Sequence, residues 1–247
     1  MCELLGYSAD DTRDIARWLT PFRLRGGQTG DNPDGWGVAA WGESGVDIVK
    51  SPEPGFSSAD FARLAATLHT KLLIAHVRKA RHPPVPGMLN THPFNHTCCN
   101  RSWVFAHNGL VPEVIEWRSA DAPWKPLGET DSEHAFCHLL TAIADSYGDP
   151  ADPAWLGRLA EFAEGTAALG KFNFLLSDGT VLIAYGHDRL HYLDASDGPG
   201  HRVVIATEAL TSEAWKPFAP GELRVYRDGV LLARRIAGEA DAQLTEP

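Results

Sequence analysis

The chain has 247 residues and a formal net charge of -10, with 44% hydrophobic and 22% charged residues. This composition is that of a globular protein, and because no basic run exceeds a few residues, we expect no nucleic-acid partner. The N-terminus lacks the basic and apolar segments of a secretory signal, and no apolar stretch is long enough to span a membrane. We therefore expect a cytoplasmic protein with a small-molecule substrate and no membrane partner.

Apolar spacing and turn residues predict the elements of the first half of the chain. They are a strand over residues 2–8, a helix over 11–22, a turn at 34–37 that feeds a strand over 38–41, a helix from Ser57 or Ser58 to about Leu68, and strands over 72–77 and 103–106. Residues 83–87 are predicted to be a stiff, proline-rich loop between two of these strands.

Helices come first in the second half. The sequence Thr130-Asp131-Ser132-Glu133 fits a capping box and predicts a helix to about residue 143, followed by a helix over 153–164. Strands are predicted over 172–176, 181–185, 202–206 and 223–226, with turns at 178–179 and 228–229. Because the helices form a block between strand-rich segments, the pattern favours an α+β fold of antiparallel sheets over a βαβ repeat. We expect one domain over residues 1–247.

Cysteine at position 2 is the first candidate for chemistry. We expect removal of Met1 because the second residue is small, and Cys2 would then carry both a thiol and a free α-amine. The ordinary pKa of an α-amino group is about 7.7–8.0 and that of a free thiol about 8.5, so the amine could serve as a base beside its own nucleophile. Taken alone, a cysteine at this position is more often incidental.

Seven short motifs follow one another along the first half of the chain. They are Met1-Cys2-Glu3-Leu4-Leu5-Gly6, Arg25-Gly26-Gly27, Asp34-Gly35-Trp36-Gly37, Ala75-His76-Val77-Arg78-Lys79-Ala80, Asn90-Thr91-His92-Pro93-Phe94, Ala106-His107-Asn108-Gly109 and Thr130-Asp131-Ser132-Glu133. In this order, the motifs resemble the class II glutamine amidotransferases, and in particular small stand-alone members such as the γ-glutamyl hydrolase of ergothioneine biosynthesis. The resemblance implies a four-layer αββα sandwich of the N-terminal-nucleophile (Ntn) hydrolases.

The reaction implied by the resemblance is cleavage of the γ-amide of glutamine, or of a γ-glutamyl compound, through a thioester on Cys2. No metal or organic cofactor is required. The larger amidotransferases add a synthase domain that consumes the ammonia, and we expect that this chain has no room for one. Three hypotheses therefore remain: a hydrolase, an ammonia-supplying glutaminase subunit with a separate synthase partner, and a non-catalytic amino-acid-binding homologue. The intact set of motif residues argues against the third.

The resemblance also assigns the catalytic residues. Cys2 would attack the amide carbon, while the side-chain amide of Asn108 and the backbone N–H of Gly109 would form the oxyanion hole. Asn-Gly is also a common turn dipeptide, so this pair depends on the other motifs for its assignment.

Substrate binding is assigned in the same way. Arg78 would bind the α-carboxylate, which a guanidinium matches with two parallel hydrogen bonds, and Asp131 would accept the α-ammonium. Gly27 would let the backbone approach the ligand. The simpler alternatives are a surface or sheet-edge arginine, an acidic residue favoured by a helix N-terminus and a plain loop glycine. Three histidines also match family positions and are expected to be structural: His76, His92 and His107.

One residue departs from the family pattern. Arg81 stands before His82 where the larger amidotransferases have a threonine. A guanidinium in place of a hydroxyl would alter contacts around the ligand, and it is compatible with a larger or more anionic γ-glutamyl substrate than free glutamine.

A competing interpretation places a zinc site at four residues: His92, His96, Cys98 and Cys99. Adjacent cysteines chelate poorly in tetrahedral geometry, and the segment has no Cys-x2-Cys pair, so the sequence does not favour it. With Cys2 and Cys137, these are the four cysteines of the chain, and their spacing suggests no disulfide framework.

Overall fold

Two antiparallel sheets lie face to face at the centre of the computed structural model, which describes residues 1–81, 83–84, 87–117, 123–148, 153–196, 200–238 and 243–244. The first sheet has the strand order β11 (Lys216–Pro217), β9 (His191–Asp194), β10 (Arg202–Ala206), β1 (Glu3–Asp14), β4 (His69–Val77), β2 (Trp36–Gly42) and β3 (Gly45–Ser51). The second has the order β14 (Gln243–Leu244), β13 (Val230–Ile236), β12 (Glu222–Arg227), β8 (Leu182–Gly186), β7 (Lys171–Ser177), β6 (Arg101–Leu110) and β5 (Phe94–Cys98).

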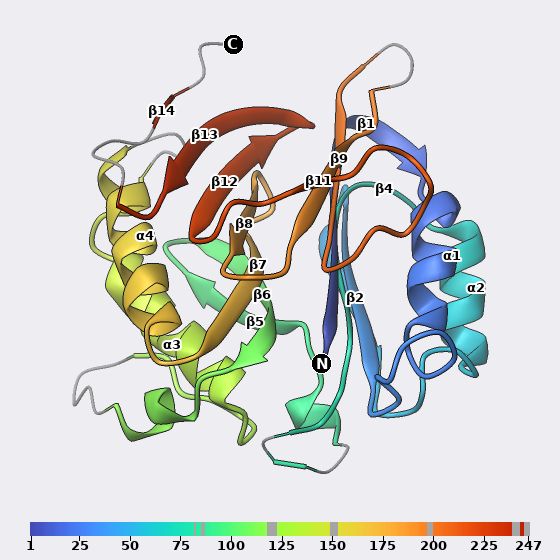
Figure 1. Ribbon diagram of the computed structural model, residues 1–247, viewed down its shortest axis with the longest axis horizontal. Coiled ribbons are helices and arrows are strands. Elements are labelled where there is room, and N and C mark those ends of the chain that lie inside the picture. Colours follow the sequence, from blue (N-terminus) through green and yellow to red (C-terminus); the bar gives the residue numbers. More distant parts are fainter. Residues whose placement is uncertain are drawn as a thin grey trace.

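Helices cover the outer face of each sheet (Figure 1). The first sheet carries α1 (Ala16–Leu24) and α2 (Ala59–Thr67), and the second carries α3 (Asp131–Ile143) and α4 (Pro153–Ala167). Two short 3-10 helices, η1 (Met88–Asn90) and η2 (Pro112–Glu116), lie in the connections. The expected α+β architecture, a four-layer αββα sandwich, is confirmed.

Both faces of the central strands are buried, because each sheet packs on helices on one side and on the other sheet on the opposite side. Side chains therefore alternate between two apolar layers with the period of two that a strand imposes. In β6, Trp103 and Phe105 pack toward α3, whereas Val104 and Ala106 pack between the sheets. This explains why the central strands read as continuous apolar runs in the sequence.

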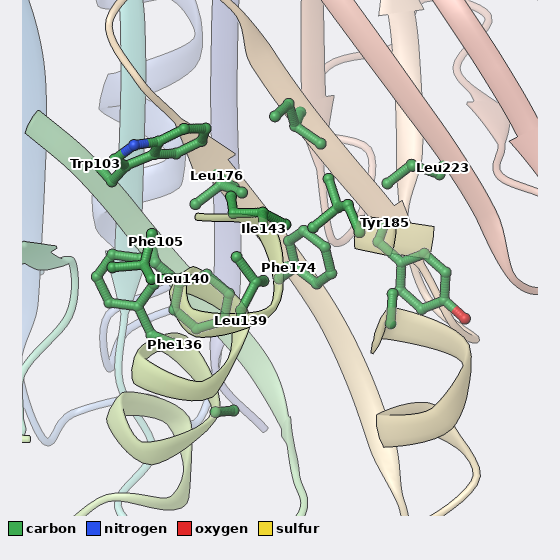
Figure 2. Packing of buried hydrophobic residues seen from close by; sticks show 14 of the residues in the cluster. Trp103, Phe105, Phe136, Leu139, Leu140, Ile143, Phe174, Leu176, Tyr185 and Leu223 are labelled. Carbon is green, nitrogen blue, oxygen red and sulfur yellow. The ribbon is translucent and has the colours of Figure 1, made fainter. Parts of the chain in front are cut away.

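Several aromatic rings pack among aliphatic side chains in the layer between the second sheet and its helices (Figure 2). The rings of Phe105 and Phe136 stack with their centroids 5.1 Å apart and an interplanar angle of 5°. Tyr185 and Phe174 stack in the same layer with centroids 5.5 Å apart. This packing fixes α3 against β6, and these two elements carry candidate site residues.

The predicted helices and strands are all present, with differences at their ends. The first helix begins at Ala16 rather than at residue 11, because residues 11–14 continue β1, where Arg13 and Asp14 pair with β4. The predicted end of the 103–106 strand was also wrong, since β6 runs through Asn108-Gly109 to Leu110 instead of turning there. Six strands had not been predicted: β3, β5, β9, β11, β13 and β14.

The predicted capping box is half confirmed. The Thr130 hydroxyl accepts a hydrogen bond from the Glu133 N–H at 3.1 Å, as expected for an N-cap. The Glu133 carboxylate, however, accepts from the Gly128 N–H at 2.7 Å, two residues before Thr130. Part of the predicted 83–87 loop lies outside the described residues, and no described helix is long and apolar enough to cross a membrane.

Candidate active site

Four separate segments bring the candidate residues to one edge of the sandwich. Cys2 immediately precedes β1, and Arg78 immediately follows β4. Because Glu3 pairs with Val77 in the antiparallel ladder, these two residues come together at the same strand ends. Asn108 lies near the end of β6, and Asp131 is the first residue of α3. Figure 1 shows the N-terminus at this edge, between the two sheets.

Backbone groups of Lys79 hold the Cys2 thiol. The Lys79 N–H donates to the Cys2 Sγ at 3.2 Å, and the Sγ lies 3.4 Å from the Lys79 carbonyl oxygen. Burial raises the pKa of the Cys2 thiol, although the Lys79 contact and the positive charge of Arg78 act in the opposite direction. While Met1 is attached, the Cys2 nitrogen lies in a peptide bond, and the thiol has no adjacent α-amine to take its proton.

Asn108 and Gly109 lie directly beside Cys2. The Asn108 side-chain amide donates to the Cys2 carbonyl oxygen. A Cβ on Gly109 would lie 1.7 Å from the Lys171 carbonyl oxygen and 2.5 Å from the His107 Nε2, so only glycine fits there. The two residues are thus side by side in a strand, which rules out the turn alternative.

Arg78 is almost fully buried, with 2% of its surface exposed. Its main chain is fixed by the turn at residues 34–35. The Arg78 N–H donates to the Gly35 carbonyl at 2.8 Å, and the Arg78 carbonyl accepts from the Asp34 N–H at 3.0 Å. The guanidinium donates to the Pro83 carbonyl at 3.3 Å. Burial lowers the pKa of Arg78, and the nearby Cys2 and Asp34 act against that shift. The surface and sheet-edge alternatives for Arg78 do not agree with this burial.

Asp131 is held with both oxygens engaged. One carboxylate oxygen accepts from the Val111 N–H at 2.6 Å, and the other accepts from the Ser132 N–H at 2.9 Å. Its side chain is therefore fixed at the start of α3, and it is buried with 4% exposure. A carboxylate offers about four acceptor sites, so it can still accept from a substrate ammonium.

These side chains line one small pocket. It is bounded by Cys2, Arg78, Lys79, Arg81, His92, His107, Gly109, Leu110, Thr130, Asp131 and Ser132. Arg81 is exposed at its rim. Gly27 is not among the described residues that line it. The φ of Gly27 is +115°, and a Cβ there would meet the Phe56 ring at 3.0 Å, so its backbone conformation alone accounts for the glycine.

Three buried histidines lie against this pocket. The His76 Nε2 lies 3.2 Å from the His107 carbonyl oxygen, and the rings of His76 and His92 stack with centroids 4.1 Å apart. The His107 Nδ1 lies 2.8 Å from the Ser132 Oγ, and its Nε2 lies 3.1 Å from the Lys171 carbonyl oxygen. His107 therefore connects β6, which carries Asn108, to the start of α3.

Desolvation governs all three imidazoles. Burial lowers the pKa of His76 to about 3, and it also lowers the pKa values of His92 and His107. Neutral rings suit the contacts, since a single Nε2–H in His76 and in His107 can donate to the carbonyl that each faces.

The family follows from comparison with known proteins. The family model described as "Glutamine amidotransferases class-II" matches residues 1–200. The chain belongs to the class II glutamine amidotransferases. It is 35% identical over 254 residues to YafJ of Escherichia coli strain K12, provisionally named a glutamine amidotransferase, which covers 92% of this chain and 97% of YafJ. It is also 28% identical to the γ-glutamyl-hercynylcysteine sulfoxide hydrolase of Mycobacterium tuberculosis, over 81% of this chain and 78% of that protein.

Solved structures support the same assignment. A crystal structure of a predicted glutamine amidotransferase from Pseudomonas aeruginosa aligns with a TM-score of 0.69 and 30% identity, over 94% of this chain and all of that one. Glutamine phosphoribosylpyrophosphate amidotransferase from Bacillus subtilis aligns with a TM-score of 0.64 over 98% of this chain and 49% of its own. At 17% identity, the second comparison shows the shared Ntn-hydrolase fold alone.

The structure separates the residues of the competing zinc interpretation. His92 stacks on His76, whereas the His96 Nε2 lies 3.5 Å from the Cys137 Sγ. Cys98 is buried and Cys99 is exposed. Among the described residues, no group of three or more His, Cys, Asp or Glu side chains is arranged to hold a metal ion.

Sequence reasoning missed two residues that contact the candidate site residues. Lys79 acts through its backbone N–H, which no side-chain motif reveals. Asn173 lies on β7 opposite Asn108 and donates to its carbonyl. A polar residue within the apolar run 172–176 was the available signal, because a buried amide needs partners for all its hydrogen-bonding groups.

Proposed function

We propose that this amidotransferase cleaves the γ-amide of glutamine or of a γ-glutamyl compound through a γ-glutamyl thioester on Cys2. One observation carries the proposal: Cys2, the buried Arg78, Gly109 and the buried Asp131 line one pocket from four segments of the chain, and the Asn108 amide contacts the main chain of Cys2. This set offers a nucleophile, oxyanion donors and partners for both charges of an α-amino acid.

Substrate binding uses the two buried charges. Arg78 binds the α-carboxylate and Asp131 accepts the α-ammonium, so that the γ-carbonyl extends toward Cys2. The fixed geometry of both residues reduces the entropy lost when substrate binds in the reactive orientation.

The chemistry then has two halves. The Cys2 thiolate attacks the γ-carbonyl carbon, and Asn108 and Gly109 stabilise the oxyanion of the tetrahedral intermediate. Collapse of the intermediate breaks the C–N bond, and the leaving amine takes a proton. Water then hydrolyses the thioester to a γ-carboxylate and restores the thiol.

Proton transfer requires the α-amine of Cys2. Burial raises the pKa of the thiol, so at neutral pH it needs a base to form the thiolate. The neighbouring histidines are poor candidates because burial lowers their pKa values and their ring contacts are structural. Removal of Met1 would free an amine with an ordinary pKa of about 7.7–8.0, held beside the thiol by the residue itself.

In the substrate that we favour, the amine released from the γ-amide is larger than ammonia. The γ-glutamyl-hercynylcysteine sulfoxide hydrolase named above is a relative that acts on a substituted γ-glutamyl compound. In this chain, Arg81 is exposed at the pocket rim, where it can face the leaving group rather than the glutamyl end.

A mass-spectrometric labelling experiment tests the proposal. A glutamine-like diazo-ketone should add once to the wild-type protein, on Cys2, and intact mass should show the loss of Met1. Cys2→Ala should not react. Cys99→Ala is the matched control, because it removes an exposed thiol outside the pocket and should keep the label. Labelling of Cys99 instead of Cys2, or full activity of protein that retains Met1, would contradict the mechanism.

A further inference from the structure

Asn173 is a fully buried amide with all of its hydrogen-bonding groups engaged. It lies in β7 directly opposite Asn108 in β6, and its Nδ2 donates to the Asn108 carbonyl at 3.1 Å and to the Asp188 Oδ1 at 2.9 Å. Its Oδ1 accepts from the N–H groups of His187 at 2.8 Å, Asp188 at 3.1 Å and Arg189 at 3.2 Å. One side chain thus connects the strand next to Cys2 with the turn after β8.

The turn is tied to the sheet by a second contact. The Lys171 Nζ lies 2.6 Å from the Asp188 Oδ2, and the Lys171 carbonyl oxygen is the group that the His107 Nε2 contacts. Asp188 therefore gives the amide of Asn173 a fixed partner on the side away from Asn108. A buried amide held in this way can fix the main chain that it contacts.

Asn108 depends on its main chain for its orientation. Its Nδ2 contacts the Cys2 carbonyl, but its Oδ1 has no hydrogen-bonding partner among the described residues. The side chain is therefore not fixed on both sides by neighbouring groups. Its direction follows from the position of the β6 backbone, which the Asn173 amide contacts at the Asn108 carbonyl.

We propose that Asn173 is a positioning residue that holds Asn108 so that its amide points at the developing oxyanion. This inference rests on the proposed function, since an oxyanion forms only if Cys2 attacks a carbonyl. Asn173 does not line the pocket, and it acts through the main chain of Asn108.

The variant Asn173→Asp separates positioning from folding. A carboxylate can still accept from the three N–H groups of the turn, but it cannot donate to the Asn108 carbonyl. In Asn173→Asp, the new carboxylate would face the Asp188 carboxylate. The double variant Asn173→Asp/Asp188→Asn removes this repulsion and restores a donor to the contact between positions 173 and 188, but the Asn108 carbonyl still lacks its donor. With L-glutamine and γ-glutamyl-p-nitroanilide as probes, both variants should lose about 10²-fold in kcat, with KM changed by about twofold or less.

A double-mutant cycle with Asn108→Ala gives the readout that a purely structural role would not affect. Asn108→Ala alone should lose about 10²–10³-fold in kcat, and adding Asn173→Asp should cost little more, because the two residues act as a unit. Additive losses, or a kcat of the Asn173→Asp/Asp188→Asn protein equal to that of wild type, would overturn the inference. Labelling of wild-type Cys2 is measured first, because its absence would overturn the proposed function, and this inference with it.

Discussion

Burial sets the charge state of the three histidines against the pocket. His92 is 3% exposed, and neither ring nitrogen has a hydrogen-bonding partner among the described residues. The groups whose charges disfavour its protonation are His76, His107, Arg78 and Lys50. A proton on this ring would therefore be repelled by its neighbours without gaining a partner.

This arrangement makes the unfolding free energy depend on pH. His92 binds a proton in the unfolded chain below pH about 6.5, but its pKa in the folded protein lies well below that value. The unfolded state then binds more protons, so stability is complete above pH 6.5 and decreases as the pH falls toward the folded-state pKa. The slope for one such histidine is at most about 1.4 kcal/mol per pH unit.

His92→Phe should remove this contribution while keeping an aromatic ring stacked on His76. Denaturant unfolding at pH 7, 6, 5 and 4.5 should show the variant gaining stability relative to wild type as the pH falls. His69→Phe, which makes the same substitution at an exposed histidine, is the control. A pH-independent difference for His92→Phe would show that folding does not lower the pKa of His92.

At the level of single elements, the start of α3 has two roles. Thr130 caps the helix by accepting from the Glu133 N–H, and the next residue, Asp131, faces the pocket. Ser58 caps α2 in the same way, accepting from the Phe61 N–H at 3.3 Å, but α2 lies on the outer face of the first sheet, away from the pocket. Ser58 is therefore a matched control for Thr130, since it caps a helix that lies away from the pocket.

Thr130→Ala and Ser58→Ala should each cost about 1 kcal/mol of stability, as loss of an N-cap side chain commonly does. Only Thr130→Ala should also raise KM, because loss of the cap loosens the first turn that holds the Asp131 carboxylate. Thermal unfolding together with kinetics on γ-glutamyl-p-nitroanilide measures both effects. Equal KM values for the two variants would indicate that the cap does not control Asp131.

The elements also show what sequence reasoning can reach. Central strands and capped helices were predicted because continuous apolar runs and N-cap residues are local signals. β3 was missed because its residues alternate between exposed and half-buried positions, as expected at a sheet edge. The boundary between β1 and α1 depends on pairing of Arg13 and Asp14 with β4, a contact that neighbouring residues in the sequence do not reveal.

At the scale of the whole molecule, the site is a product of topology. The order of motifs predicted which residues come together, and the structure brings Cys2, Arg78, Gly109 and Asp131 to one pocket. The prediction came from a family pattern rather than from local spacing. Contacts made by main-chain groups, such as those of Lys79, could not be predicted because they depend on three-dimensional register.

The charge distribution of the whole molecule distinguishes Arg81 from the other two cations that line the pocket. The net charge of -10 repels anionic ligands at long range, whereas the pocket is lined by Arg78, Lys79 and Arg81. Arg78 is buried, and the Lys79 Nζ lies 2.8 Å from the Asp31 carboxylate. Arg81 is exposed, and an exposed cation at a pocket mouth can favour an anionic leaving group.

Arg81→Thr should therefore reduce kcat/KM for an anionic substrate more than for a neutral one. We expect about a tenfold loss for γ-glutamyl-4-aminobenzoate and about twofold or less for neutral γ-glutamyl anilide, with the difference shrinking at high salt. Arg63→Thr makes the same change in net charge on the exposed surface of α2, where the Arg63 side chain is 72% exposed, and should affect both substrates equally. Amine release measured for both substrates gives the comparison. Equal losses in Arg81→Thr would show that Arg81 does not distinguish leaving groups by charge. A wild-type protein that prefers free glutamine to both substituted substrates would contradict the larger substrate class.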